Sequence, residues 1–516
     1  MDADTILLMR PALAELLAGF AGCFADHRTA AHLDTYVSGQ LGGLDRKSVE
    51  PIADAAGVAP RTLQQFLGLA AWDHEQMRDR TQQRVARRHA HPGSIGIIDE
   101  TSFPKKGQKT ACVQRQHCGA LGKIENCVVS VHLGYATPGL TEPSDPQHPL
   151  DPSDFHTLLD SDLYLPESTW DAHPARKAAA GVPEEVTYRP MWRIALTQID
   201  RALANGIVFG YLTFDEAYAK RKGFLKGLEE RGQRYVAEIP RDFHLWTARP
   251  AVLHEAPADA PVRAGRPLLY PRLKDPDAAT KRCDEVAAGS TALKRQPWTR
   301  YLVKEGTQGP AVWEAKRMRV YARSREGLPG GALHLVVARN ALNQKEVKMF
   351  LSNADASVSL EELMTVAFSR WRIERMFQDA KMELGMDHFE VRSYLSIQRH
   401  LILTTLSLLF LAEFKQTARR AEADRGEADG GEIAAGSACS GPTLNQISTV
   451  LRTLAIVWLE GGRCSRQRAE TLSAQCWRTR RRNAASTKSA RKRRVADLQA
   501  IGIEPDELPR CVWVHF

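Results

Sequence analysis

The chain has 516 residues, of which 43% are hydrophobic and 25% charged, so at about 100–200 residues per domain it should form three or four globular domains. Apolar runs, the longest at 401–411, stay below the ~18–20 residues of a membrane helix. Acidic residues precede the first apolar stretch, which argues against a secretory signal. Nine cysteines without a CxxC pair exclude a disulfide framework and a usual zinc site. We therefore expect a cytoplasmic protein with reduced thiols.

The charge is unevenly distributed. The net charge is +9, with a pI of about 9.1, and the segment 478–494 (RTRRRNAASTKSARKRR) contains nine basic residues and no acidic one. Such a run is either a solvated, disordered tail or an arm that binds a polyanion, because each neutralised phosphate releases counterions. The sequence leaves both interpretations open.

The N-terminal region, residues 1–90, shows apolar residues at helical spacing. Within it, 49–55 predicts a short helix, Gly57 a turn, and Pro60 the start of a second helix. The outward-facing residues of the second helix are expected to be Arg61, Gln64 and Gln65. This pattern is typical of a helix-turn-helix that binds DNA, but a plain helical bundle would also produce it.

Residues 91–240 predict an α/β sheet with helical crossovers, because short apolar strands alternate with helices. The predicted strands are 94–100, 126–136, 206–216 and 234–240. The predicted helices are 192–205 and 222–231, and a long loop is expected at 137–183.

The second half of the chain is predicted to consist of a β-rich insertion followed by mainly helical segments. Residues 241–350 predict a β-rich insertion, in which Trp313 either packs in the core or stacks on a flipped base. Residues 351–415 are predicted to return to the core as helices, and 416–443 are predicted to be a linker. The C-terminal part, 444–516, is expected to be helical with a basic tail.

Two carboxylates follow apolar strands, Asp99 and Asp215. A carboxylate at the edge of a buried strand is costly unless it is hydrogen-bonded, paired or bound to a metal. Strand ends of α/β sheets are also common ligand sites. Taken alone, each acid is explained somewhat better as a mark of the strand boundary than as a functional group. The acids that follow them, Glu100 and Glu216, are expected to point away because strand side chains alternate.

A third candidate carboxylate, Glu374, belongs to a predicted helix. Arg370, Glu374 and Lys381 fall within about 40° of one another on one stripe of this helix. Such a group is either a surface ion pair or a metal ligand whose cationic neighbours bind phosphates.

Together these segments resemble the bacterial insertion-sequence DDE transposases, specifically the branch with a Tyr-Arg-Glu-Lys signature, Y-x2-R-x3-E-x6-K. Arg370, Glu374 and Lys381 match this spacing, whereas the tyrosine position is Ala367, with Phe368 beside it. The resemblance covers about residues 94–411. The segments that carry it are IIDETSFPKKG, RQHCGALGKIENC and RWRIERMFQDAKMELGMDHFEVRSY.

The resemblance implies an RNase H-like catalytic core, with Asp99 on its first strand, Asp215 on its fourth and Glu374 on a later helix. It also implies that residues 241–350 interrupt the core as a β-domain. The three carboxylates would be catalytic and would hold two Mg²⁺ or Mn²⁺ ions, since oxygen ligands favour these metals and paired ions align the attacking and leaving oxygens of a phosphodiester.

The implied activity is cleavage of DNA at the element ends and transfer of the cut strand into target DNA. The partners would be the terminal inverted repeats, the target DNA and a second copy of the chain assembled on DNA, at the bacterial nucleoid and without a membrane. The alternatives are a nuclease that cuts without joining and a domesticated transposase that only binds DNA. The residues expected to contact DNA are Arg370, Lys381, Lys105, Lys106, Arg115, Lys123, His388 and Arg392.

Overall fold

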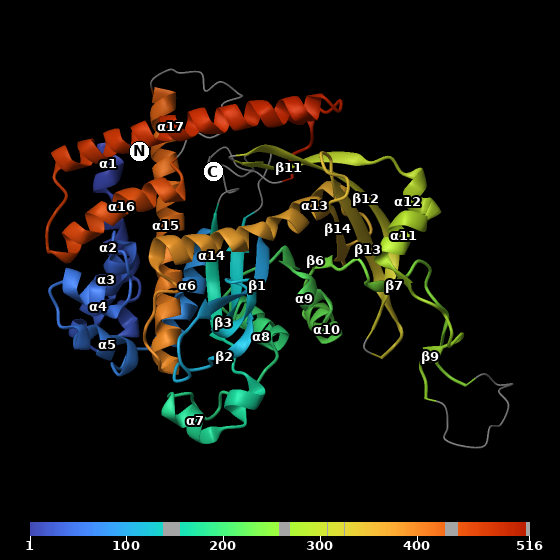
Figure 1. Ribbon diagram of the computed structural model, residues 1–516, viewed down its shortest axis with the longest axis horizontal. Helices are drawn as coiled ribbons and strands as arrows, with labels where there is room; N and C mark the ends of the chain where they lie inside the picture. Colours follow the sequence, from blue (N-terminus) through green and yellow to red (C-terminus); the bar gives the residue numbers. More distant parts are fainter. Residues whose placement is uncertain (138–154, 257–268, 307, 325, 429–441, 512–516) are drawn as a thin grey trace.

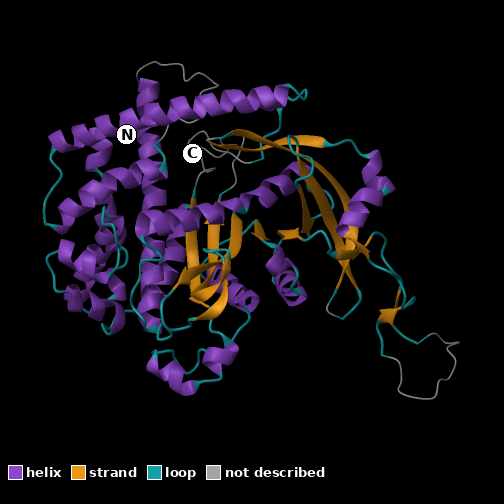
Figure 2. Cartoon of the chain, in the orientation of Figure 1, coloured by secondary structure: helices purple, strands orange, loops and turns teal. Residues whose placement is uncertain are grey.

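The computed structural model describes residues 1–137, 155–256, 269–306, 308–324, 326–428 and 442–511. Helices from both ends of the chain gather on one side of a large mixed sheet, and the segment after β6 extends the molecule on the other side (Figures 1 and 2). This arrangement confirms the α/β class predicted from the sequence.

The N-terminal region is helical, as predicted. Its helices are α1 (Ala3–Leu7), α2 (Met9–Ala18), α3 (His27–Leu41), α4 (Val49–Ala55), α5 (Pro60–Gly68) and α6 (His74–Arg88). Helix α4 has the predicted bounds, α5 begins at Pro60 as predicted, and Gly57 between them has a φ of 64° that favours glycine. Leu63, Phe66 and Leu67 of α5 are buried. Its exposed residues are Arg61, Gln64 and Gln65.

The core of the sheet has the order β4-β3-β1-β5-β6, with β2 also paired to β3. Strand β1 is antiparallel to β3 and parallel to β5, which is parallel to β6. Helices α8, α9 and α10 make the crossovers to the parallel strands. The elements are β1 (Ile95–Pro104), β2 (Gln114–Cys118), β3 (Lys123–Ala136), β4 (His156–Leu163), α8 (Met191–Ala204), β5 (Tyr211–Phe214), α9 (Glu216–Ala219), α10 (Lys222–Glu230) and β6 (Tyr235–Ile239).

The insertion continues this sheet. Strand β14 pairs with β6, β13 with β14, and β12 with β13, so that twelve strands of the described chain form one sheet. Two short strands, β8 and β9, pair separately. The elements are β7 (His244–Trp246), β8 (Val252–Leu253), β9 (Arg272–Leu273), β10 (Lys281–Arg282), α11 (Cys283–Gly289), α12 (Thr291–Arg295), β11 (Thr299–Gly306), β12 (Gly309–Arg323), β13 (Pro329–Asn340) and β14 (Val347–Ser352).

Two predictions of the core were wrong in detail. The expected loop 137–183 contains β4, a π-helix (Glu167–Asp171) and α7 (Pro174–Ala179), besides residues 138–154, which lie outside the described residues. The polar letters of β4, HTLLDSDL, obscured a buried strand because Asp160 and Asp162 are paired there with Arg201 of α8. The expected strand 206–216 is shorter, from Tyr211 to Phe214.

Three helices follow the insertion: α13 (Leu360–Ser369), α14 (Trp371–Leu384) and α15 (Tyr394–Ala428). Helix α15 continues beyond residue 416, where the sequence predicted a linker; residues 429–441 of that linker lie outside the described residues. The 394–422 part of α15 is long and apolar enough to cross a membrane, contrary to the estimate from apolar runs, but 94% of its most apolar window is buried. Because α15 packs on β4, α3 and α5, it is a core helix of this fold.

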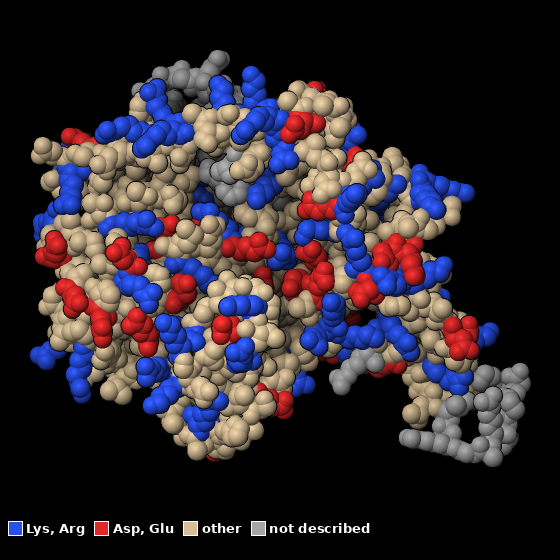
Figure 3. Space-filling view, viewed as in Figure 1, with Lys and Arg blue, Asp and Glu red and all other residues tan. Residues whose placement is uncertain are grey.

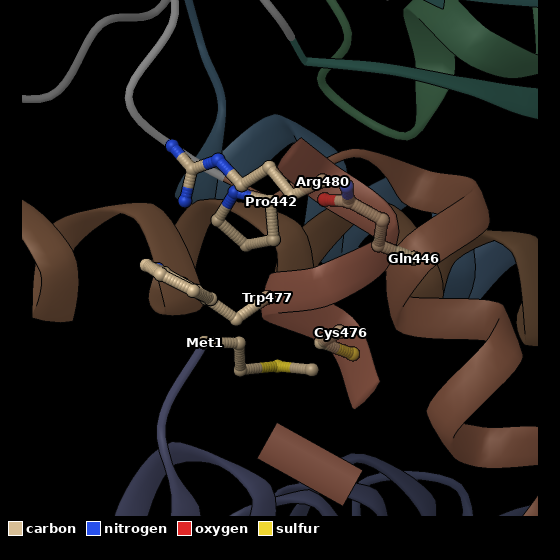
Figure 4. A pocket seen from close by; sticks show the side chains of 6 residues that line it. All are labelled: Met1, Pro442, Gln446, Cys476, Trp477 and Arg480. Atoms are coloured by element: carbon tan, nitrogen blue, oxygen red, sulfur yellow. The ribbon is translucent and has the colours of Figure 1, made fainter. Parts of the chain in front are cut away.

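The basic run is part of a long helix, so the prediction of a tail was wrong. Helices α16 (Leu444–Leu459) and α17 (Arg466–Gln499) close the described chain, and α17 runs along the upper edge of the molecule in Figure 1. It packs on α1 near its start and on β12 near its end. Near its start it closes a small pocket together with residues of the N-terminus and α16 (Figure 4). The lining residues are Met1, Pro442, Gln446, Cys476, Trp477 and Arg480.

Candidate active site

Asp99 lies in the middle of β1, between two buried stretches of the strand. The parallel pairing of β1 with β5 runs from Ile95 to Ile98 and stops one residue before Asp99. Ile97 belongs to the core that includes residues of α14, and Ile98 to the core on the opposite face, because side chains alternate along a strand. Asp99 therefore points to the same face as Ile97, toward α14.

Asp215 follows the last residue of β5 and caps the N-terminus of α9. Its Oδ1 accepts hydrogen bonds from the backbone N–H groups of Ala217, at 2.9 Å, and Tyr218, at 3.3 Å. A carboxylate in this position satisfies helix donors that otherwise have no partner. Asp215 therefore has a structural role at the strand boundary and also places a carboxylate at the same sheet edge as Asp99.

Three carboxyl groups repel one another at this edge. Burial, followed by the charges of Glu100 and Asp215, raises the pKa of Asp99 to about 8, although Arg370 opposes the shift. Burial and the charge of Asp215 also raise the pKa of Glu100, so the sequence expectation that Glu100 points away underestimates its effect on the site. The buried carboxyl group of Glu100 faces the hydroxyl of Tyr218, which partly opposes this rise of its pKa. The other acid expected to point away, Glu216, has a half-exposed side chain whose Oε2 lies 3.7 Å from Lys220 Nζ.

Arg370 joins the carboxylates of three elements. It lies between α13 and α14, and its Nη1 is 3.4 Å from Asp99 Oδ2, whereas its Nη2 is 2.8 Å from Glu374 Oε1. Its Nε is 3.4 Å from Oε2 of Glu238 on β6. Burial lowers the pKa of Arg370, but the charges of Asp99, Glu374 and Glu238 outweigh burial and raise it. The guanidinium therefore neutralises part of the negative charge at this edge.

Glu374 lies in the first turn of α14 and is much less enclosed than Asp99. Its side chain is 60% exposed, against 18% for Asp99, and it forms an ion pair with Arg370. Lys381, which lies on the same stripe of α14, donates a hydrogen bond from Nζ to Thr101 Oγ1 on β1 at 2.7 Å. Helix α14 is therefore tied to β1 at both Asp99 and Thr101.

The structure brings Asp99 and Asp215 together and connects Glu374 to Asp99 through Arg370. It does not form a complete metal cage, since no group of three His, Cys, Asp or Glu side chains in the described ranges is close enough to hold an ion. The donor set still fits a divalent cation. The available ligands are carboxylate oxygens, the charges of Glu100 and Asp215 repel that of the buried Asp99, and the Glu374 side chain is 60% exposed.

The remaining residues predicted to contact DNA fall into two groups. Lys105 and His388 make internal contacts: Lys105 Nζ donates to the carbonyl of Phe389 at 2.6 Å, and His388 Nδ1 accepts from the N–H of Lys47 at 3.1 Å. Burial lowers the pKa of Lys105 to about 8 and also lowers that of His388. The other group is exposed at the surface and consists of Lys106, Arg115, Lys123 and Arg392.

Two charged residues near the site were not found from the sequence. Glu238 was treated only as part of a predicted strand, yet it contacts Arg370 and also Lys348 Nζ, at 2.7 Å. The sequence did offer one signal for Glu238: it is an acid inside the predicted strand that follows the Asp215 strand. Lys304 of β11 lies within charge range of Glu374, and its Nζ is 4.5 Å from the centre of the Trp371 ring. No sequence signal linked it to the site, because the insertion had to be placed first.

The residues at the missing tyrosine are apolar. Ala367 is buried, and Phe368 packs against Trp313, with 4.9 Å between ring centres. Trp313 is 5% exposed. The core-packing interpretation of Trp313 is therefore the one that the structure supports.

Comparison with known proteins places the chain in a family. The family described as DDE superfamily endonuclease matches residues 19–310, which is more than half of the sequence. The chain belongs to the DDE superfamily endonucleases. The matched part contains Asp99 and Asp215, and Glu374 lies beyond it. This membership confirms the resemblance to DDE enzymes and, in general terms, the use of divalent metal.

A curated relative adds a more specific likeness. The chain is 27% identical over 222 residues to a protein of Microchaete diplosiphon described as a probable transposase for insertion sequence element IS701. The match covers 43% of this chain and 51% of the relative, so it spans about half of each protein.

Proposed function

We propose that this DDE superfamily endonuclease is the transposase of an insertion sequence, which cuts DNA at the ends of its element and joins the cut strand to target DNA. The observation that carries the proposal is the sheet edge at which Asp99 and Asp215 meet and to which Arg370 links Glu374. The strand order β4-β3-β1-β5-β6 supports an RNase H-like core, and the IS701 transposase supports the element class.

Asp99, Asp215 and Glu374 are the proposed ligands of two Mg²⁺ or Mn²⁺ ions. When bound, such ions assist attack on a phosphodiester and stabilise the leaving oxygen. Arg370 keeps Asp99 and Glu374 near each other while no cation separates them. Glu238 gives the guanidinium a further partner, so that Arg370 stays in place when the two carboxylates turn to other ligands.

The proposed chemistry has two steps. Attack by water on a phosphodiester at the element end breaks the bond to the 3′-oxygen and leaves a free 3′-hydroxyl and a 5′-phosphate. That 3′-hydroxyl then attacks a phosphodiester of the target, forms one new bond and releases a target 3′-hydroxyl. Exposed Lys106, Arg115, Lys123 and Arg392 are proposed to hold the DNA backbone, and Arg61, Gln64 and Gln65 of α5 to contact bases in the element ends.

The assembly proposed on DNA is a homodimer, with one copy for each element end, in the bacterial nucleoid. The deciding experiment incubates the purified chain and Mg²⁺ with duplexes that carry the inverted repeats flanking its gene and with a supercoiled target plasmid. Nicked ends joined to plasmid support the proposal. Ends that are cut and never joined indicate a nuclease, and ends that are bound and never cut indicate a DNA-binding protein.

Substitutions test the site itself. Asp99→Asn and Asp215→Asn should each abolish cutting while end binding is retained, because the carboxylates serve chemistry rather than the DNA backbone. Glu216→Gln is the matched control, since Glu216 is adjacent in sequence, has a half-exposed side chain and is paired only with Lys220 among the contacts described. Cutting that survives at Asp99→Asn or Asp215→Asn would remove that residue from the site.

A further inference from the structure

Helix α17 divides its basic residues between two faces. The nine Lys and Arg residues of 478–494 are not distributed evenly around the helix, because three are half-buried and six are exposed. At about 100° per residue, the six exposed residues fall within an arc of about 140°, and the three half-buried ones lie on the opposite side. The exposed residues are Arg478, Arg481, Arg482, Lys488, Lys492 and Arg493.

The inner face anchors the helix to the protein. Arg480 pairs with Glu422 of α15 at 2.9 Å, and Arg491 pairs with Glu305 of β11 and with Asp506. The Cβ atom of Arg494 packs against Gly309, where an added methyl group would meet it at 2.8 Å. The apolar residues of α17, Ala469, Leu472 and Leu498, are buried on this side as well. These contacts fix which way the outer face points.

The cations of the outer face do not anchor α17 to the rest of the described chain. None of its six cations forms an ion pair with a residue of the described ranges. Arg478 Nε donates to the Ala474 carbonyl of its own helix, and Arg481 lies 4.0 Å above the ring of the exposed Trp477. Lys and Arg side chains gather along the upper edge of the molecule in Figure 3, where Figure 1 shows α17.

The geometry of this face matches a phosphate backbone. Arg478 and Arg493 are fifteen residues apart, which is about 22 Å along a helix. One strand of B-DNA places a phosphate about every 3.4 Å along its axis, so this length faces about six phosphates. A membrane is a poorer fit, because an interfacial helix needs a free apolar face and that of α17 is buried against the protein.

We propose that the outer face of α17 is a sequence-independent binding surface for the backbone of duplex DNA, separate from the carboxylate site. The inner-face ion pairs hold the helix against the body of the protein, and the outer cations therefore face away from β1 and α14. This surface would hold DNA that lies outside the catalytic edge, either flanking DNA or target. The proposal relies on membership of a DNA-cutting family and does not require strand joining.

The test measures binding of the full chain to a fluorescent duplex without element sequence, in EDTA, over a series of KCl concentrations. The variant replaces Arg482, Lys488, Lys492 and Arg493 by Gln, which keeps helix propensity and removes side chains without partners in the described chain. If each neutralises one phosphate, the slope of log K against log[KCl] should become shallower by about 3.6, at ~0.9 per phosphate. Affinity at low salt should fall by at least tenfold.

The matched control removes four exposed cations of the insertion: Lys274→Gln, Lys281→Gln, Lys294→Gln and Arg295→Gln. It carries the same change in net charge, so its slope should change by less than 1. An equal change in both variants would mean that overall charge, not α17, sets the affinity, and an unchanged slope in the α17 variant would return this face to a solvated surface. A larger loss with single-stranded RNA than with duplex DNA would also overturn the proposal. Failure of the proposed catalysis would be seen separately, as absent nicking with this salt dependence intact.

Discussion

The two ends of α14 each carry a glutamate, and these two side chains lie in opposite environments, one exposed and one buried. Glu374, in the first turn, is 60% exposed and contacts Arg370. Glu383, in the last turn, is 4% exposed and accepts hydrogen bonds from Ser448, from Arg452 Nη2 at 2.9 Å and from Asn445 Nδ2 at 3.2 Å. All three donors belong to α16.

The difference separates an acid that serves the fold from an acid available for chemistry. A buried carboxylate surrounded by donors is stabilised in one position and has few lone pairs left for a ligand. An exposed carboxylate with one ion pair is held weakly, because such pairs contribute about 0–1 kcal/mol. Glu374 can therefore change partners at little cost, whereas Glu383 cannot.

The largest expected effect is on catalysis. Glu374→Gln should reduce the rate of nicking on the order of 10³-fold or more, because a catalytic group that acts as part of a unit removes most of the activity when it is lost. The melting temperature should stay within about 1–2 °C, since the side chain is mostly exposed. A single-turnover nicking assay on a pre-nicked and an intact end measures both the cutting and the joining step. Normal nicking by this variant would mean that another acid completes the site.

Divalent metal should stabilise the folded chain by binding to the proposed carboxylate ligands, and Glu383 should not take part. At 100 times its dissociation constant, an ion that binds only the folded state adds about 2.7 kcal/mol to the free energy of unfolding. Mn²⁺ and Mg²⁺ should therefore raise the melting temperature of the native chain, and EDTA should reverse the shift. Asp99→Asn should remove most of this shift, and Glu383→Gln should retain it. A shift of equal size in the Asp99 variant would place the ion elsewhere.

Glu383→Gln should affect stability more than activity. The substitution keeps the shape but removes the charge that faces Arg452. It also replaces one of the two acceptor oxygens, to which Asn445 on one side and Ser448 and Arg452 on the other donate, by an amide group that cannot accept. Because Arg452 is 42% exposed and can return to water, we expect a loss of about 2 kcal/mol rather than the ~3–5 kcal/mol of a fully buried pair. Urea unfolding measures this loss, and nicking at 25 °C should stay within a few-fold. Loss of nicking with unchanged stability would reverse the roles assigned to the two glutamates.

The smallest expected effect concerns pH. The pKa of Asp99 is raised from 3.8 to about 8 in the folded chain, so between these values the folded state binds more protons than the unfolded state. Without metal, the contribution of Asp99 to the free energy of unfolding should therefore be greatest below pH 4 and should be lost as the pH rises toward 8. Allowing for relaxation of the site, Asp99→Asn should recover about 1–2 kcal/mol at pH 8 relative to pH 5. If the free energy of unfolding changed equally with pH in the native chain and in Asp99→Asn across this range, the buried environment described for Asp99 would be contradicted.

Much of the fold could be predicted from local patterns. The turn at Gly57 and the crossover helices α8 and α10 were predicted almost to the residue, because apolar periodicity and turn residues determine them locally. Strand β4 was missed because its aspartates are neutralised by Arg201 of α8, a helix that packs on this strand. The basic run was predicted as a tail because its support comes from Glu422 and Glu305, which are distant in the sequence.

The candidate site was predictable to a similar extent. The stripe of Arg370, Glu374 and Lys381 follows from helix geometry, and the structure brings Arg370 and Lys381 to β1. Glu238 and Lys304 could not be found in this way, because their proximity to the site depends on how the insertion strands join the core. Residue spacing along one helix carries no information about such neighbours.

The pairing of β14 with β6 makes the insertion and the core one cooperative structure. A domain attached by two flexible connections can unfold alone, but here the backbone hydrogen bonds run without interruption from β12 to β1. Heating should therefore melt the insertion together with the strands that carry the carboxylates. Removal of 241–346 would leave β14 as an open edge, with Met349, Phe350 and Leu351, now buried, beside an unpaired row of backbone donors and acceptors. Such a shortened chain is expected to aggregate, so the insertion protects the core in addition to any contact that it makes with DNA.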